Sequence, residues 1–365
     1  MTDNTATARP PFRPADVLDP HVMGDEASMY ALFDYLRSTD PVSWVEHPEY
    51  RPFWNLTRYA DVKAIGSAND EFLSAPRTVL VPEAMEQALL ETFGNKNGLE
   101  TLIHMDRPKH LKLRKVTREW FLPRSIDKLE AEVRALVKEF VDKMVEEGPE
   151  CDFVRDVALL LPLRVIVSIL GLPREAEPTM LKLTQEMFGG QDPSLQRGED
   201  PTAGLAVIQD FTDYFTEVIA ERKRAPSDDL ASVLANATVD GEPMETLDQM
   251  SYFIITASAG HDTTSAAIGG GMKALIEHPD QLALWRDRPD LDDRAARELI
   301  RWVSPVRHMV RTATREVELG GRTIREGDNL ALWYPAANRD PDAFDAPNRL
   351  DLSRDPKQQL AFGYG

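Results

Sequence analysis

Apolar side chains recur every three to four residues over most of the chain after residue 106. The pattern is clearest just after Pro123, where charged residues separate apolar ones at helical spacing. The apolar positions there are Ile126, Leu129, Val133, Leu136, Val137, Phe140, Val141 and Met144. Similar patterns predict helices over residues 25–37, 59–68, 154–170, 176–188, 203–224, 227–236, 246–277, 279–288 and 292–303, and Asp106 with Pro108 resembles a further helix start.

Alternating apolar and polar residues mark two shorter regions as β structure. Residues 42–59 are rich in aromatic and β-branched types and predict two strands with a turn. Residues 311–335 alternate around Gly-Gly and Glu-Gly-Asp turns and predict a small sheet. Weak periodicity makes residues 74–102 a loop with one or two helical turns. The Pro- and Asp-rich residues 338–360 are expected to be coil.

The predicted fold class is therefore mainly α with small β-sheets (α+β). No stretch has linker composition, so we expect residues 1–365 to form a single domain. The polar, Pro-rich residues 1–20 are expected to be a flexible N-terminal arm.

Composition and charge argue against some classes of binding partner. The net charge of −19 argues against nucleic acid, which needs a basic face. No apolar run is long enough for a membrane span, and the N-terminus lacks a signal-peptide core, so we expect a cytoplasmic protein with no membrane contact. The one cysteine fits a reducing compartment.

The long segment 246–277 contains TASAGHDTTSAAIGGG, with polar and glycine residues in the middle of a predicted helix. Each Gly costs roughly 1 kcal/mol against Ala there, and Ser and Thr hydroxyls compete for helix carbonyls. We therefore expect this helix to open locally around a bound planar group, with Asp262 and Thr263 positioned to pass protons. The alternative is a surface helix with a polar face, which the preceding apolar FIITASA disfavours. His261 is expected to be a structural partner, not a catalyst.

Two charged pairs are weaker signals by themselves. Glu298 and Arg301 are three residues apart on one helix face, where Arg349 from the later coil could join them. His110 and Arg114 share a face near a helix start and, with Arg311, could bind carboxylates. From spacing alone, a plain basic amphipathic helix explains His110 and Arg114 better.

Other chemistries lack their motifs. The seven histidines show no zinc spacing, and no GxGxxG, Walker or GxSxG motif occurs.

Taken in order, these segments resemble cytochrome P-450, the family of thiolate-haem monooxygenases. AGHDTT resembles its oxygen-activation segment, ELIR its Glu-x-x-Arg helix, HLKLR its His-x-x-x-Arg contact to the haem propionates, and LAFGYG the start of its cysteine loop. The stretches GPECDFVRDVALLLPLRVIVSILGLP and EPTMLKLTQEMFGG look closest to bacterial monoterpene (terpineol) hydroxylases.

The resemblance implies a cytochrome P-450 fold that is C-terminally truncated. The family's iron-ligating cysteine would lie four residues beyond Gly365, so no metal ligand is expected within this chain, and Cys151 lacks the turn glycines to replace it. The loop that follows, a helix and the terminal strands would also be missing. This chain alone would then be inactive.

The implied cofactor is haem b, and the implied reaction is hydroxylation of a small hydrophobic, terpenoid-like substrate with O₂. Two electrons would come from a ferredoxin-type donor and its reductase. Asp262 and Thr263 would be catalytic, and Glu298, Arg301 and Arg349 a structural network. Haem would be bound by His110, Arg114, Ala259, Gly260, Arg311 and Phe362, and substrate by Ile103, Thr256, Val306 and Met309. The alternative function is a haem-free helical binding or scaffold protein of the same fold.

Overall fold

The computed structural model describes residues 11–364 apart from residues 76, 190–191, 193, 196 and 199–202. Most of them are helical. The α-helices are α1 (Pro20–Gly24), α2 (Glu26–Thr39), α3 (Tyr59–Ser67), α4 (Glu83–Phe93), α5 (Lys109–Val116), α6 (Pro123–Glu147), α7 (Leu160–Ile169), α8 (Glu177–Phe188), α9 (Ala203–Arg224), α10 (Leu230–Ala235), α11 (Thr246–Glu277), α12 (Pro279–Asp287), α13 (Asp292–Val303) and α14 (Tyr334–Asn338). The short turns are η1 (Pro14–Leu18), η2 (Leu102–His104), η3 (Arg118–Phe121), η4 (Val154–Ala158), η5 (Arg174–Ala176) and η6 (Pro289–Leu291).

The strands form one five-stranded sheet and two hairpins. In spatial order the sheet is β1 (Val42–His47), β2 (Tyr50–Leu56), β9 (Asn329–Trp333), β6 (His308–Ala313) and β3 (Phe72–Leu73). The hairpins pair β4 (Thr238–Val239) with β5 (Glu242–Pro243), and β7 (Val317–Leu319) with β8 (Arg322–Ile324). β2 and β9 are parallel, and the other neighbours in the sheet are antiparallel. The sheet therefore joins two parts of the chain that are far apart in sequence.

Strand β9 is the central strand of the sheet, and its side chains are buried on both faces of the sheet. Leu330 and Leu332 pack into one apolar cluster with Leu56, whereas Ala331 and Trp333 pack into another with Phe33 of α2. This alternation follows from the two-residue period of a strand. The core of the helical part is a third cluster, which includes Phe211, Phe215 and Phe253.

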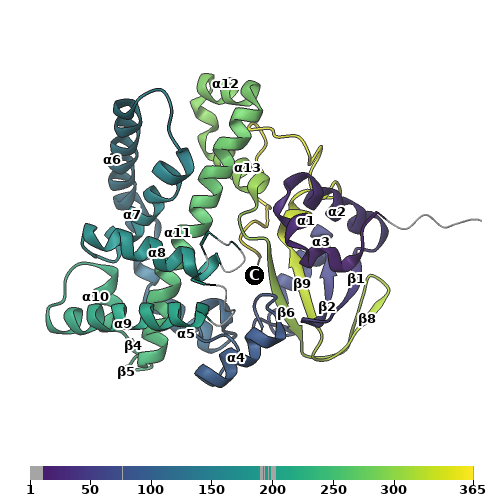
Figure 1. Ribbon diagram of the computed structural model, residues 1–365, viewed down its shortest axis with the longest axis horizontal. Coiled ribbons are helices and arrows are strands. Elements are labelled where there is room, and N and C mark those ends of the chain that lie inside the picture. Colours follow the sequence, from purple (N-terminus) through teal and green to yellow (C-terminus); the bar gives the residue numbers. More distant parts are fainter. Residues whose placement is uncertain are drawn as a thin grey trace, which may run out of the picture.

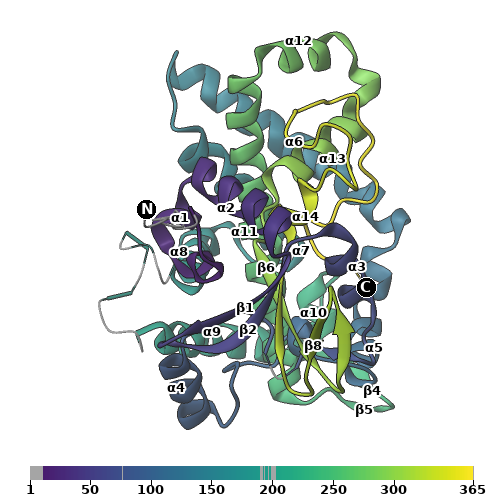
Figure 2. The ribbon, with the colours of Figure 1, turned by 90° about the vertical axis from the view of Figure 1, so that its right-hand side faces the viewer.

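The helical part and the sheet part lie side by side, with α11 running along the helical part toward their junction (Figure 1). Helices α6 to α10 lie on the far side of α11 from the sheet, and α1, α2 and α3 accompany the sheet. The last described residues lie between α5 and β6 and beside α3 (Figures 1 and 2). The end of the chain thus reaches the junction of the two parts.

The predicted fold class is confirmed, and most predicted helices are present within a few residues of their expected ends. Three expectations were wrong in detail. Residues 11–20 are not a flexible arm, because η1 packs Val17 against the α2 cluster; residues 1–10 lie outside the described residues. Residues 74–102 contain α4, which is 11 residues long and so makes about three turns. Residues 311–335 do not form a sheet of their own, since β6 and β9 pair with the N-terminal strands.

Helix α11 was expected to open locally, and it does not. Every residue from Thr246 to Glu277 is α-helical. The hydroxyls of Thr263 and Thr264 donate to the carbonyls of Ala259 and Gly260, one turn earlier, at 2.9 and 3.1 Å. The glycines serve close packing instead: a Cβ on Gly260 would lie 2.6 Å from Ile166 Cδ1 of α7.

Candidate active site

A cavity of about 430 Å³ lies at the junction between the sheet, α5 and the end of the chain. Six of the residues singled out from the sequence line it, although they come from four separate segments. They are Ile103, His110, Arg114, Met309, Arg311 and Phe362. Leu102 and Met105 add apolar surface. The fold therefore brings together the predicted propionate-binding, substrate-binding and turn residues.

The cavity carries a surplus of positive charge. Arg107, Arg114 and Arg311 line it, and none of them forms an ion pair with a carboxylate of the described residues. Arg311 Nη1 donates to the Val310 carbonyl at 2.9 Å, and its buried Nε has no partner there. The one lining carboxylate, Asp106, already accepts from the backbone N–H groups of Ser74 and Ala75 at 2.8 and 3.0 Å. Unpaired guanidinium groups in such a cavity suit a ligand with carboxylates.

His110 adds a polar group on the same wall. It lies one turn before Arg114 on α5, so both side chains share a helix face. Burial lowers the pKa of His110, and the charge of Arg114 lowers it further. The ring is therefore a neutral donor near neutral pH.

The final turn of the chain closes the cavity through contacts only glycine permits. Gly363 has φ of +83°, and a Cβ there would lie 2.8 Å from the Tyr334 hydroxyl oxygen. Gly66 of α3 has no room for a Cβ either, because the Tyr364 carbonyl oxygen would be 2.7 Å away. Tyr334, Gly66 and Gly363 all line the cavity, and sequence reasoning missed them as site residues. The FGYG run could have pointed to Gly363 as a site residue, whereas no sequence pattern pointed to Gly66 or Tyr334.

The predicted residues of α11 do not line this cavity. Thr256, Ala259, Gly260, Asp262 and Thr263 are half-buried, and α11 contacts the elements that line the cavity at η2 and through the ion pair of Asp248 with Lys109 of α5. Burial raises the pKa of Asp262. The carboxyl is thus suited to hold and release a proton closer to neutral pH. Val306 is also outside the lining and packs on the sheet cluster.

The predicted Glu-x-x-Arg pair lies in the interior with both side chains inaccessible to solvent. Arg301 donates to Glu298 through Nε and Nη2, both at 2.7 Å. Arg301 Nη1 donates to the carbonyls of Asn338 and Pro347 at 2.7 and 3.0 Å. The pair therefore fixes the coil that leads to the final turn.

The third member of this network was predicted wrongly. Arg349 is exposed and pairs with Asp351 at 2.8 Å. Arg354 takes the predicted place, with Nε 3.2 Å from Glu298 Oε1. Arg354 also donates to the Asp345 carbonyl, which turns its side chain back under the coil. Spacing could not distinguish two arginines five residues apart in a segment with no regular structure.

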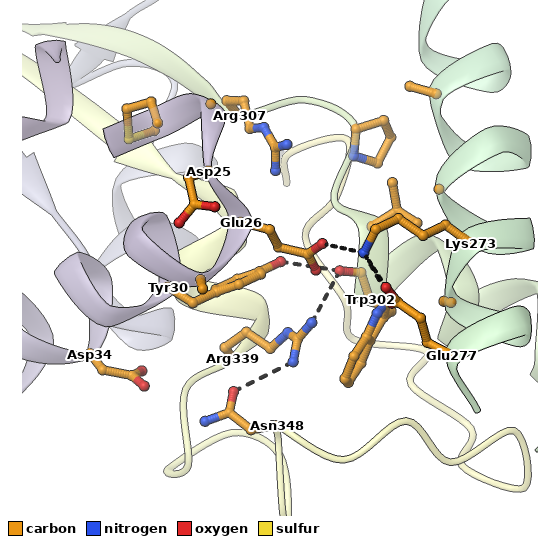
Figure 3. A pocket seen from close by; sticks show the side chains of 18 residues that line it. Asp25, Glu26, Tyr30, Asp34, Lys273, Glu277, Trp302, Arg307, Arg339 and Asn348 are labelled. Atoms are coloured by element: carbon orange, nitrogen blue, oxygen red, sulfur yellow. Dashed lines mark hydrogen bonds and ion pairs between the residues drawn. The ribbon is translucent and has the colours of Figure 1, made fainter. Parts of the chain in front are cut away.

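A larger cavity of about 860 Å³ lies between α2, α11 and the end of α13 (Figure 3). Its charges are mostly satisfied within the protein. Lys273 bridges Glu26 and Glu277, and the buried Arg339 stacks on Trp302, with its guanidinium carbon 3.5 Å from the ring centroid. None of the predicted site residues lines it. The smaller cavity is therefore the better candidate for the active site.

The comparisons with known proteins identify the family. The family model for cytochrome P450 matches residues 290–365. Cytochrome P450-terp of a Pseudomonas species is 36% identical over 96% of this chain and 84% of its own length. The crystal structure of CYP108D1 from Novosphingobium aromaticivorans is 42% identical, with a TM-score of 0.84 over 92% of this chain and 81% of that one. CYP268A2 of Mycobacterium marinum, solved in complex with pseudoionone, is 33% identical, with a TM-score of 0.87 over 97% and 87%.

A mainly helical fold of this kind, with a buried Glu-x-x-Arg pair and an arginine-rich cavity, is that of the haem monooxygenases to which these relatives belong. The chain belongs to the cytochrome P450 family. In full-length form its activity is that of a P450 monooxygenase, and the family's cofactor is protoporphyrin IX haem.

The cavity fits the carboxylate-bearing side of such a cofactor. Arg114 and Arg311 are free of carboxylate partners in the described part of the chain, and Arg311 Nε is orphaned in the interior. Within that part, no three His, Cys, Asp or Glu side chains converge as a metal site, and no helix has the length and apolarity to cross a membrane.

Proposed function

We propose that this protein hydroxylates a small, hydrophobic, terpenoid-like molecule, using O₂ and electrons from a ferredoxin-type donor with its reductase. The observation that carries the proposal is the cavity in which unpaired arginines, apolar side chains and the turn at Phe362 and Gly363 meet. Ile103, Leu102, Met105 and Met309 give this cavity an apolar wall. The similarity to cytochrome P450-terp supports the terpenoid class. A haem-free scaffold is not favoured, because the relatives are monooxygenases.

Several side chains from different parts of the chain would together bind the cofactor. Arg114 and Arg311 would pair with its two carboxylates, and His110 would donate a hydrogen bond to one of them. Ala259 and Gly260 were predicted to face the cofactor, but Gly260 packs on Ile166 of α7, so only Ala259 would remain to face a flat group. Phe362 would pack against the ring edge from the final turn. When bound, haem supplies the reduction of O₂ and the insertion of one oxygen atom into a C–H bond.

Asp262 and Thr263 would deliver the protons that the reaction consumes. The Thr263 hydroxyl donates to the Ala259 carbonyl, 2.9 Å away, and in the reaction it would donate a hydrogen bond toward the oxygen instead. Asp262 has a raised pKa because it is buried, so it can take up a proton from solvent and pass it inward. Ile103 and Met309, which line the cavity, would contact the substrate, whereas Thr256 and Val306 lie outside its lining.

No cysteine of the described residues lines the cavity. Cys151, the one cysteine in the sequence, is exposed and is not among the residues lining the cavity. The relatives are longer than the chain, which spans 84% of cytochrome P450-terp.

The test is the carbon monoxide difference spectrum of the reduced, intact gene product. A thiolate-ligated haem absorbs far to the red of a histidine-ligated one. Spin-state titration with a compact monoterpene alcohol and with a bulkier steroid then reports the substrate class. We expect a red-shifted band and tighter binding of the monoterpene. Colourless protein would refute the function, and preference for the steroid would refute the substrate class.

A further inference from the structure

His261 makes an unusual contact for a residue in the middle of a long helix. It is 0% exposed, and its Nε2 lies 2.8 Å from the carbonyl oxygen of Leu159, 102 residues earlier in the chain. Leu159 follows the π turn η4 and immediately precedes α7. The contact therefore ties the middle of α11 to the start of α7. Turns of this π type are often found at functional sites.

The hydrogen-bond geometry fixes the protonation of this imidazole. A carbonyl oxygen only accepts, so Nε2 must carry a proton. Nδ1 is buried and has no partner among the described residues. A proton on Nδ1 would be an unsatisfied buried donor, which costs about 1–3 kcal/mol. The ring is therefore neutral, with its single proton on Nε2, and burial lowers its pKa accordingly.

The interface around His261 leaves little freedom for α11 to turn. The neighbouring Gly260 is so close to α7 that a Cβ would lie 2.6 Å from Ile166 Cδ1. Successive helix residues point about 100° apart, so fixing the direction of one side chain fixes the next two. Asp262 and Thr263 are those next two residues. A rotation of α11 that broke the His261 bond would swing both of them.

We propose that His261 is a positioning residue, whose hydrogen bond to Leu159 sets the rotation of α11 and thereby aims Asp262 and Thr263. The inference rests on the proposed function, because the orientation of Asp262 and Thr263 matters only if these two residues deliver protons. His261 touches no reacting atom in this scheme. It acts through the two residues that follow it.

The test compares two substitutions at residue 261 of the intact enzyme. His261→Leu keeps a similar volume but removes the donor, whereas His261→Gln keeps an N–H near the position of Nε2. We expect the Leu variant to form roughly threefold less product per NAD(P)H, with unchanged substrate affinity, and the Gln variant to recover most of the loss. His278→Leu is the matched control, since its ring also bonds a carbonyl of α11, that of Ala274 at 2.8 Å, and it should couple normally.

A second measurement does not depend on turnover. NMR spectra of ¹⁵N-histidine-labelled enzyme report the protonation of each ring, and the signals that disappear in His261→Gln belong to His261. These signals should show a neutral ring protonated on Nε2, with no change from about pH 6 to about pH 8. A protonated Nδ1, normal coupling in the Leu variant, or equal losses in the Leu and Gln variants would overturn the proposal. Loss of haem from the Leu variant would also overturn it, because the role would then be structural. Failure of the proposed function appears instead in the wild-type enzyme, as a missing thiolate-haem spectrum.

Discussion

Arg301 and Glu298 form a two-point ion pair in which neither side chain reaches solvent. The two N–O distances are both 2.7 Å, and the second amino group of Arg301 holds two carbonyls of the following coil. Arg354 reaches the same carboxylate from that coil. One helix turn thus holds several points of the coil that follows α14, a segment with almost no regular structure of its own.

Breaking this pair should destabilise the protein strongly. Glu298→Gln leaves the Arg301 charge buried with no counter-charge of its own, which typically costs about 3–5 kcal/mol. We expect a lower free energy of unfolding in denaturant titration and little haem-loaded protein on expression. Arg301→Lys should act similarly, since Lys cannot make the two-point contact.

Arg349→Ala is the matched control for the network. Its ion pair with Asp351 is exposed, and such pairs contribute about 0–1 kcal/mol. We expect almost unchanged stability and haem content. Arg354→Ala should lie between the two, and a larger effect for Arg349 than for Arg354 would contradict the arrangement described above.

Thr263→Ala should uncouple electron consumption from product formation. Without the hydroxyl, the proposed proton relay from Asp262 would be broken, so NAD(P)H oxidation should continue while product per NAD(P)H falls by roughly tenfold. Thr264→Ala removes a similar hydroxyl one residue further, on an exposed position, and should couple normally. Equal coupling in wild type and Thr263→Ala would refute the assigned role.

Arg311→Gln should weaken haem retention. A charge-assisted hydrogen bond contributes about 1.5–3 kcal/mol, so the haem dissociation constant should rise by about 10- to 100-fold. Haem transfer to apomyoglobin measures this directly. Arg315→Gln serves as the control, because Arg315 is exposed and already paired with Glu71 at 2.6 Å. Unchanged transfer rates for Arg311→Gln would mean that the cavity binds something else.

Gly363→Ala should disturb the final turn through a contact as well as through backbone strain. The new Cβ would sit 2.8 Å from the Tyr334 hydroxyl oxygen. Gly321→Ala has a similar positive φ of +74° but meets nothing within 4 Å, so it measures strain alone, about 1–3 kcal/mol. We expect Gly363→Ala to lower the melting temperature and haem content more than Gly321→Ala does. Equal effects would show that the contact with Tyr334 is unimportant.

Glu86 should make the packing of α4 sensitive to acid. Burial by itself would raise its pKa, but the hydrogen bonds and charges of Arg77 and Arg51 outweigh this and lower the pKa from 4.5 to about 2. The lowered value means that this carboxylate stabilises the fold fully above about pH 4.5, and that the contribution is lost as pH falls toward about 2. The difference in unfolding free energy between wild type and Glu86→Gln should shrink over that range. A constant difference would argue against the ion pairs.

Local chemistry determined much of this protein from sequence alone. Helical periodicity located α2, α9, α11 and α13, because a helix is stabilised by contacts three and four residues apart. Motif order was enough to identify the family and to select Glu298, Arg301, His110, Arg114 and Arg311. These are properties that a short stretch of sequence carries by itself.

The tertiary structure decided what depends on contacts distant in sequence. Only the fold pairs β2 with β9, chooses Arg354 over Arg349 beside Glu298, and sets His261 against Leu159. It also kept α11 continuous, because Thr263 and Thr264 bond to their own helix and Gly260 packs on α7. Such choices follow from which segments meet in space, and spacing along a chain does not contain that information.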